Sequence, residues 1–285
     1  MSKERKVKMR RIEMFKQAMN EKRALKVISG INNIDLERVE MIVSSAIEAK
    51  ATAVDIAAKQ EVIELSQRLI SESNSDIMLM VSSVVPMELA TAVNMMNVEA
   101  IELGNFDAMY REGLSMTSSQ IISLVEETLS LIQERRSEIL FSVTIPGMLP
   151  ISEQISLARK LEEMHIDLIQ TEGYISQEMM NIDLEGSRMW LNRAELTISN
   201  TLELSRNIEL PIMTSSNINT ITAPFAFAAG ASVIGCGSCI NRLESKISML
   251  GVISNLVEIA NRNGIMMSSL RESRMMSSVE MTSLV

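Results

Sequence analysis

Eight short apolar runs, separated by segments of helical periodicity, are the feature that most constrains the fold of this 285-residue chain. Each run is bounded by polar residues or glycine, which is the pattern of a buried strand. The runs cover residues 24–30, 51–58, 76–84, 100–105, 139–146, 167–173, 210–216 and 232–238. Strict alternation of strands and helices implies right-handed crossovers and a parallel sheet. We therefore expect a single α/β domain, a (β/α)8 barrel of the TIM type, which needs about 250 residues.

The two ends of the chain lie outside this barrel, which we assign to residues 24–261. Residues 1–23 carry nine Lys or Arg and three Glu, a net charge of +6 that leaves −15 on the remainder. Because a transit peptide is rich in Ser and poor in acids, we expect instead a basic helix that closes the N-terminal mouth of the barrel. Residues 262–285, rich in Ser and Met, are expected to form a mobile tail or one held by a partner.

Composition excludes several functions. The net charge of −9 argues against a nucleic-acid binder, and no apolar stretch reaches the 18 residues of a membrane span. Cys236 and Cys239 form a CxxC pair, but two thiols without a nearby Cys or His cannot complete a four-ligand zinc site. A small buried apolar role is more common for such cysteines than a redox role. The sequence thus predicts neither a metal nor a cofactor.

Two helix starts and one long connection can be placed locally. The segment from Thr117 to Gln120 is a capping box, and Ser152 after Pro150 is a second candidate N-cap. The connection 173–187 is longer than a barrel loop needs, and it follows the C-terminal end of the sixth strand. It is either a lid over the active face or an insertion without fixed structure.

Strand alternation predicts a polar barrel interior, because successive side chains point to opposite faces. The inward residues would be Lys26, Asp55, Ala57, Ser82, Glu102, Gly104, Thr144, Gln170, Glu172, Ser215, Gly235 and Gly237. Lys26 is the only base among them. Since an unpaired buried charge costs several kcal/mol, we expect Lys26 to pair with Asp55 or Glu102.

These charges allow a catalytic or a structural interpretation. A desolvated Lys26 beside carboxylates could act as a base or Schiff-base nucleophile. Lys26 lies near the start of its strand, however, and catalysis in such barrels occurs at strand C-terminal ends, so a structural ion pair is preferred. Glu172, at the end of its strand, is the predicted acid/base, with Asp55, Glu102 and Lys26 as a supporting electrostatic cluster. Three inward acids holding Mg²⁺ is a weaker alternative.

A phosphate clasp is predicted after the last two strands. Backbone amides in these loops, together with the starts of the following helices, can form an anion-binding nest. Asn217 tolerates the left-handed backbone that such a turn needs. The predicted phosphate-binding residues are Ser215, Ser216, Asn217, Gly235, Gly237 and Ser238.

Several segments together resemble a known family: residues 26–33, 52–58, 81–89, 100–113, 143–162 and 169–173, of which the ELGN-F-D and QTEG blocks are the most specific. They are similar to the hypothetical chloroplast reading frame twenty-three family, over about Ala24 to Val257. The members of that family are encoded in algal plastids, cyanobacteria and plant nuclei. The resemblance implies a TIM-like barrel and a plastid or cyanobacterial setting, and it supplies no reaction.

Two functions remain open at this point. The first is a protein of the plastid stroma that binds a small phosphorylated metabolite at the C-terminal face, with proton-transfer isomerase or lyase chemistry if it is catalytic. The second is a non-catalytic binding or assembly protein, a homo-oligomer or part of a larger complex, that uses the N-terminal segment and the tail as attachment arms. Barrels host both kinds of function, so the fold does not separate them.

Overall fold

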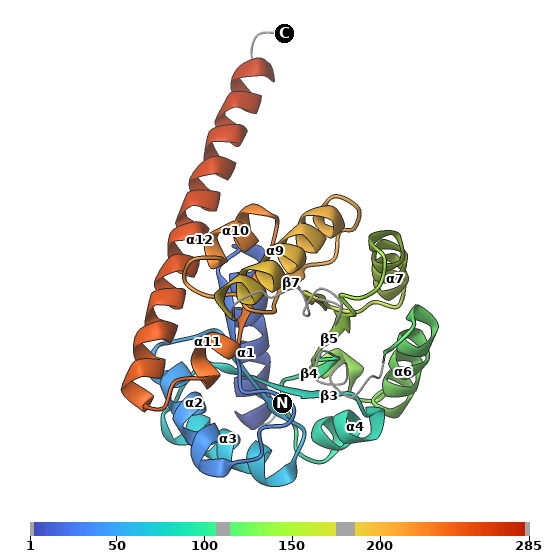
Figure 1. Ribbon diagram of the computed structural model, residues 1–285, viewed down its shortest axis with the longest axis vertical. Coiled ribbons are helices and arrows are strands. Elements are labelled where there is room, and N and C mark those ends of the chain that lie inside the picture. The colour runs from blue at the N-terminus through green and yellow to red at the C-terminus, as the bar shows by residue number, and fades with distance from the viewer. Residues whose placement is uncertain (1–2, 107–114, 175–185, 283–285) are drawn as a thin grey trace.

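Eight parallel strands close into one barrel in the order β1 to β8, which confirms the predicted (β/α)8 fold (Figure 1). The computed structural model describes residues 3–106, 115–174 and 186–282. Each predicted apolar run contains one strand, shorter than the run at one or both ends. The strands are β1 (Ala24–Ile28), β2 (Ala53–Ala57), β3 (Met78–Ser83), β4 (Ala100–Leu103), β5 (Leu140–Ile145), β6 (Leu168–Thr171), β7 (Ile212–Thr214) and β8 (Val233–Cys236).

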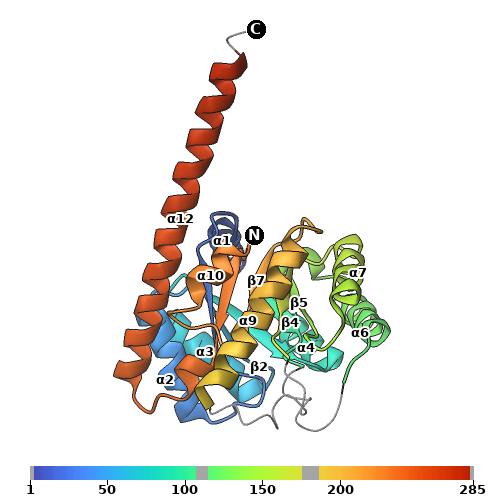
Figure 2. The ribbon, with the colours of Figure 1, turned by 45° about the horizontal axis from the view of Figure 1, so that its top comes forward.

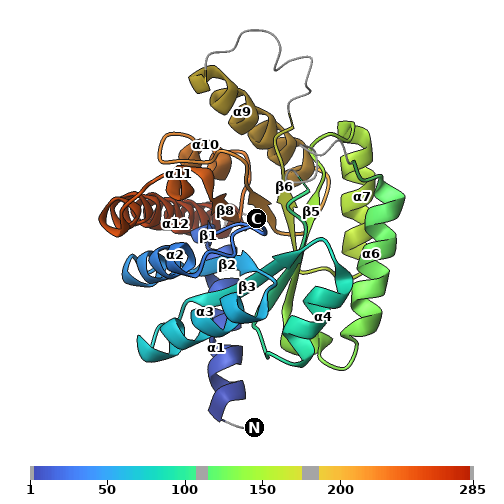
Figure 3. The same cartoon turned by 60° about the horizontal axis from the view of Figure 1, so that its bottom comes forward.

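Helices form the outer layer around the strands (Figures 1 and 3). Strand residues that point outward, such as Val27, Val54 and Ile101, are fully buried in the core between barrel and helices. The helices are α2 (Leu36–Glu48), α3 (Gln60–Glu72), α4 (Pro86–Asn94), α6 (Ser118–Leu131), α7 (Ile151–Glu163), α9 (Gly186–Ser205), α10 (Ala223–Ala228), α11 (Ser238–Asn241) and α12 (Lys246–Thr282), with a 3-10 turn at Arg136–Glu138. None of the described helices is long and apolar enough to cross a lipid bilayer.

One of the two predicted helix starts is confirmed and the other is wrong. Thr117 Oγ1 accepts from the Gln120 N–H at 3.3 Å while Gln120 Oε1 accepts from the Thr117 N–H at 2.9 Å, the reciprocal pair of a capping box. At α7 the carbonyl of Pro150 accepts the N–H groups of Glu153 and Gln154, at 2.9 and 3.0 Å. Pro150 is therefore the N-cap and Ser152 already lies in the first turn, because the backbone of Pro150 is still non-helical, with ψ of 145°, while its carbonyl already accepts the first helical hydrogen bonds.

Helix α1 (Lys3–Asn20) lies across the N-terminal mouth of the barrel, as the sequence predicts. Its buried residues pack against the lowest inward layer of the strands, which is apolar and consists of Ala24, Ala53, Met78, Ala100, Leu140, Leu168, Met213 and Val233. The polar side chains that strand alternation predicts in the interior therefore lie only above this layer, nearer the C-terminal ends of the strands. The basic side chains of α1 pair with acidic residues at this end of the barrel: Arg5 with Glu138, Arg10 with Asp76, Arg11 with Glu99, and Lys16 with Asp167.

Helix α12 continues past the predicted start of the tail at residue 262 and ends at Thr282. Its first part packs beside α2 and α10, and Asn263 Nδ2 donates to the Lys22 carbonyl at 2.6 Å. Beyond that point the helix projects away from the barrel (Figure 2). Apolar periodicity weakens after Asn261, but a helix needs no core to propagate, because each added residue closes one more intrahelical hydrogen bond.

Candidate active site at the C-terminal face

A cavity of about 510 Å³ opens at the C-terminal ends of β1, β6, β7 and β8. Glu172 and the whole predicted phosphate clasp line it: Ser215, Ser216, Asn217, Gly235, Gly237 and Ser238. Loops after the strand C-terminal ends carry the active sites of these barrels, so the cavity is at the expected face. Most of the predicted lid, residues 173–187, lies outside the described part of the chain, which omits residues 175–185.

The other three predicted site residues lie deeper in the barrel and do not line the cavity. Lys26, Asp55 and Glu102 are at most 1% exposed. The Lys26 Nζ donates to both carboxylate oxygens of Glu102, at 2.9 and 3.0 Å, and lies 3.3 Å from Asp55 Oδ2. The predicted pairing of Lys26 is thus confirmed, with both acids rather than one.

Two serines complete this buried cluster. Ser142 Oγ donates to Glu102 Oε2 at 2.8 Å, and Ser82 Oγ donates to Asp55 Oδ1. One lysine faces two acids, and burial raises the pKa of Asp55 to about 6, with the Lys26 ammonium opposing that rise and the Glu102 carboxylate adding to it. This arrangement fits a structural ion-pair cluster, while a catalytic role for its members stays a prediction. Among the described residues, no group of three or more His, Cys, Asp or Glu side chains is arranged to hold a metal ion.

A chain of hydrogen bonds crosses the barrel between this cluster and the cavity. Ser215 Oγ donates to Gln170 Oε1 at 2.9 Å, and Gln170 Nε2 donates to Thr144 Oγ1 at 3.1 Å. The hydroxyl of Ser215 is therefore already used within the protein. A Cβ at Gly235 would lie 2.0 Å from Ser215 Oγ, so this glycine leaves room for the serine hydroxyl. Gly235 also lines the cavity, and its part in phosphate binding stays a prediction.

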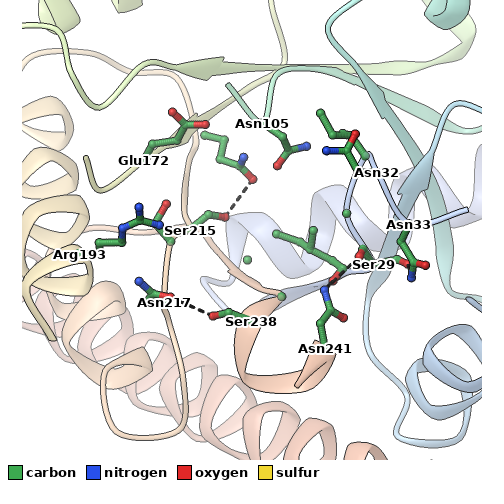
Figure 4. Close-up of a pocket in the computed structure, with 17 residues that line it drawn as sticks. Ser29, Asn32, Asn33, Asn105, Glu172, Arg193, Ser215, Asn217, Ser238 and Asn241 are labelled. Atoms are coloured by element: carbon green, nitrogen blue, oxygen red, sulfur yellow. Dashed lines mark hydrogen bonds between the residues drawn. The ribbon is translucent and has the colours of Figure 1, made fainter. Parts of the chain in front are cut away.

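The loops after β7 and β8 are tied together at the cavity. Ser216 and Asn217 adopt left-handed backbone conformations, with φ of 73° and 61°, which turns the chain sharply after β7. Ser238 Oγ, at the start of α11, donates to Asn217 Oδ1 at 3.0 Å. Asn217 thus has the left-handed backbone predicted for it, and its side chain links the loop after β7 to the start of α11 (Figure 4).

The sequence interpretation missed Arg193, which reaches the cavity from α9. A Cβ at Gly173 would lie 2.0 Å from the Arg193 carbonyl oxygen, so the glycine after Glu172 lets α9 approach the end of β6. The Arg193 Nε is buried and has no hydrogen-bond partner in the described structure. Helical periodicity does not indicate which turn of a helix reaches the axis of a barrel. The one local signal in the sequence is Gly173, which permits the approach of α9 to β6.

Two asparagines were missed as well. Asn105, with φ of 66°, follows β4, and its buried Nδ2 has no hydrogen-bond partner among the described residues. Asn241, at the end of α11, donates its Nδ2 to the carbonyls of Ile28 and Ser29, at 3.1 and 3.0 Å, while its buried Oδ1 has no partner within the described part of the chain. Both residues line the same cavity as Arg193 (Figure 4).

Two of the described residues that line the cavity have ionisable side chains, Glu172 and Arg193. The Glu172 side chain is buried, and its main-chain carbonyl accepts from Asn200 Nδ2 at 3.3 Å. One guanidinium and one carboxylate in a cavity otherwise lined mainly by amides, hydroxyls and glycines can hold an anionic ligand and move a proton.

The two cysteines pack in the core outside the cavity. Cys236 is fully buried on the outward face of β8, Cys239 is buried in α11, and both are free thiols. A hydrogen bond with Cys239, followed by burial, raises the pKa of the Cys236 thiol well above its usual value. A thiol held protonated is a poor nucleophile, so Cys236 fits the predicted apolar role. The same hydrogen bond lowers the pKa of the Cys239 thiol, which burial opposes.

Comparison with known proteins gives one matching family. The model of the family described as "Protein of unknown function (DUF561)" matches residues 9–266. The "Uncharacterized protein ycf23" of Pyropia yezoensis is 35% identical over 230 residues, which cover 81% of this chain and 80% of the relative. The protein of the same name from Cyanophora paradoxa is 32% identical over 238 residues, covering 84% and 93%. These matches confirm the resemblance drawn from the residues, and the relatives come from plastid-bearing algae.

Solved structures of similar fold are distant in sequence. A thiamine phosphate pyrophosphorylase from Pyrococcus furiosus aligns with a TM-score of 0.55 at 14% identity, covering 86% of this chain and 98% of that one. A 3-hexulose-6-phosphate synthase aligns with a TM-score of 0.56 at 11% identity, covering 83% and 99%. At these identities the likeness establishes the barrel fold alone.

Proposed function

The chain belongs to the family described as "Protein of unknown function (DUF561)", and we propose that it binds a small phosphorylated metabolite at the C-terminal face of its barrel. The ligand occupies the cavity of about 510 Å³ between Arg193, Glu172 and the loops after β7 and β8. Pockets of this size are typical of sites for small molecules. We place the protein in the plastid stroma, a setting supported by its relatives in plastid-bearing algae.

The observation that carries the proposal is the Arg193 side chain at the wall of the cavity, beside the clasp loops (Figure 4). Arginine has five N–H donors and no acceptor, and its planar fork matches the oxygens of a phosphate. Arg193 and Asn105 both line the cavity, and the oxygens of a phosphate are acceptors for N–H groups of such side chains.

The clasp loops support phosphate over another anion. Ser216, Asn217, Gly237 and Ser238 bring the loops after β7 and β8 to the same cavity, the place where (β/α)8 barrels commonly hold phosphate. The names of two structural neighbours mention phosphate compounds, a thiamine phosphate and a hexulose 6-phosphate.

The same site favours proton transfer if the protein is an enzyme. Glu172 is the only carboxylate among the described residues of the cavity, so it takes the role of acid/base in an isomerase or lyase reaction. Lys26 is paired with Glu102 and Asp55 below the cavity, which disfavours a Schiff base. In this proposal Lys26, Asp55 and Glu102 supply a fixed electrostatic background.

The assembly function has one observation in its favour. The projecting part of α12 exposes Ile265, Met266 and Leu270, with exposures of 69%, 54% and 49%. Exposed apolar side chains on a helix that leaves its domain favour contact with a second protein or another copy of the chain. Light scattering of the full chain and of a chain ended after residue 263 separates these functions, because only an assembly that uses α12 changes mass on truncation.

The test of phosphate binding uses ethyl phosphate and isothermal titration calorimetry. Hydrogen bonds to charged groups contribute about 1.5–3 kcal/mol, so Arg193→Ala should weaken binding about 10- to 100-fold. Arg206→Ala is the matched control, because Arg206 is exposed, directly follows the last residue of the same helix and pairs only with Glu203 among the described residues. Equal affinities of the Arg193 and Arg206 variants would refute the site.

Glu172 is tested separately. Glu172→Gln keeps the size of the side chain and removes its proton-transfer capacity, so it should retain ethyl phosphate within a few-fold. A ligand that co-purifies with the wild-type chain, identified by native mass spectrometry, then serves as the substrate for an exchange assay in deuterated water. Exchange by the wild type but not by Glu172→Gln would support the acid/base role, whereas equal exchange would contradict it.

A further inference from the structure

Four threonines form a continuous chain of hydroxyl groups between α9 and the two strands behind it, β6 and β7. Thr171 Oγ1 lies 2.7 Å from Thr197 Oγ1 and 3.1 Å from Thr201 Oγ1. Thr201 Oγ1 in turn lies 2.7 Å from Thr214 Oγ1. All four residues are fully buried. We call this set, Thr171, Thr197, Thr201 and Thr214, the threonine ladder.

The ladder places hydrogen bonds in a layer that is otherwise held mainly by apolar contacts. Outward strand residues such as Val54 and Val143 pack against the helices in the hydrophobic core. Apolar burial is non-directional, whereas a hydrogen bond weakens steeply away from its preferred distance and angle. A fully paired network of buried hydroxyls therefore fixes the rotation and the height of α9 against β6 and β7.

Arg193 lies on the face of α9 that carries the ladder. It precedes Thr197 by four residues and Thr201 by eight, and residues four apart lie above one another on a helix. Thr197 and Thr201 contact the strands, and Arg193 reaches the wall of the cavity from the same side of the helix (Figure 4). A Cβ at Gly173 would lie 2.0 Å from the Arg193 carbonyl oxygen, so this turn of α9 lies directly over the end of β6.

The strand members of the ladder adjoin residues of the same cavity. Thr171 precedes Glu172, and Thr214 precedes Ser215. Because side chains alternate along a strand, the threonine of each pair points toward α9 while the residue after it lines the cavity. The ladder thus connects the helix that carries Arg193 to the strand ends that carry Glu172 and Ser215.

Binding of a phosphate requires the guanidinium to be placed closely. A binding site has to be held within about 0.5 Å of its productive geometry, which at the roughly 6 Å that side chains reach from a helix axis is a rotation of about 5°. We propose that Thr197 and Thr201 are positioning residues that hold Arg193, through the ladder, in the orientation that binds the phosphate of the ligand, a role that rests on the proposed phosphate site.

The test removes one hydroxyl of the ladder at constant shape. Thr201→Val should weaken the binding of ethyl phosphate about five- to tenfold in calorimetry, less than Arg193→Ala does, because a displaced guanidinium keeps part of its interaction. Thr201→Ser keeps the hydroxyl and should restore most of the affinity. If Thr201→Val does not fold, Thr197→Val carries the same test, because it leaves the contact between Thr201 and Thr214 in place.

Thr128→Val is the matched control. Thr128 is also fully buried, and its Oγ1 donates to the Leu124 carbonyl at 2.7 Å, as the Oγ1 of Thr201 donates to the Thr197 carbonyl at 2.8 Å. It lies in α6, outside the ladder. Thr128→Val should therefore lower stability in urea unfolding as a buried hydroxyl loss does, and leave the affinity for ethyl phosphate within about twofold of the wild type.

A double-mutant cycle separates positioning from general destabilisation. With Arg193→Ala in place there is no guanidinium left to displace, so adding Thr201→Val should change the affinity by less than about twofold. An equal loss on adding Thr201→Val to the wild type and to Arg193→Ala would overturn the positioning role, because the ladder would then act on the fold alone.

The outcomes distinguish this role from the phosphate site itself. If the wild-type chain does not bind ethyl phosphate, or if Arg193→Ala binds it equally well, the phosphate site is wrong and the positioning role falls with it. If Arg193→Ala loses affinity while Thr201→Val binds as tightly as Thr128→Val, the phosphate site stands and the positioning role is wrong.

Discussion

Replacing Lys26 by Met removes the only cation of the buried cluster while keeping most of its volume. Lys26 is fully buried, 2.9 Å from Glu102 and 3.3 Å from Asp55. Removing one partner of a buried ion pair typically costs about 3–5 kcal/mol, because the remaining charge is left uncompensated. At about 2–4 °C per kcal/mol for a chain of this size, the midpoint of thermal unfolding should fall by about 10 °C.

The loss should depend on pH through Asp55. Its pKa in the folded state is about 6, above the ordinary value of 3.8, so the folded protein holds this proton more tightly than the unfolded chain does. Asp55 therefore stabilises the fold at low pH, and the benefit is lost between pH 3.8 and 6, by about 3 kcal/mol at 1.36 kcal/mol per pKa unit. Without Lys26 that pKa rises further, so Lys26→Met should be more destabilising at pH 8 than at pH 5.

Urea unfolding at pH 5 and pH 8 measures both effects. A triple variant, Lys26→Met with Asp55→Asn and Glu102→Gln, should recover most of the lost stability, because it removes the charges together. The ethyl phosphate affinity of Lys26→Met should fall by less than tenfold, since no cluster side chain lines the cavity. A Lys26→Met variant within 1 kcal/mol of wild type at both pH values would refute the reasoning about the cluster.

Two further predictions concern packing above and below this cluster. Gly235→Ala places a methyl group 2.0 Å from Ser215 Oγ, so it should lower the free energy of unfolding by about 1–3 kcal/mol and weaken phosphate-ester binding. Gly251→Ala is the control, because a Cβ there meets nothing within 4 Å and should not destabilise the protein. Equal melting temperatures of the two variants would contradict this prediction. Phe15→Ala leaves a cavity where α1 closes the barrel and should lower the free energy of unfolding in urea by about 3–5 kcal/mol. Met14→Ala is the control and should change it little, because the neighbouring Met14 is 44% exposed. A loss under about 1 kcal/mol for Phe15→Ala would mean that the barrel does not need α1.

Most of the fold could be predicted from the sequence because its signals are local. Alternation along a strand sends every second side chain inward, so Lys26, Asp55 and Glu102 were placed in the interior before any contact was known. The capping box at Thr117 needs only residues three apart. The predicted start of α7 is wrong because two local preferences compete there. A serine hydroxyl favours an N-cap at Ser152, but the non-helical backbone of Pro150 makes Pro150 the N-cap.

Only those site residues that lie at the ends of strands could be predicted from the sequence. Glu172, Asn217 and Ser238 follow directly from strands, so the closure of the barrel brings them to one face. Arg193 reaches the cavity because of the rotation of α9 about its axis and its approach over Gly173, which are set by packing between segments far apart in the chain. That Asn105 and Asn241 share one cavity with Arg193 is likewise known only once the segments around them are in place. The sequence by itself determined the barrel and the inward residues, since those depend on a residue and its near neighbours. Tertiary structure alone decided which polar side chains line the cavity, since that depends on the packing of segments far apart in the chain.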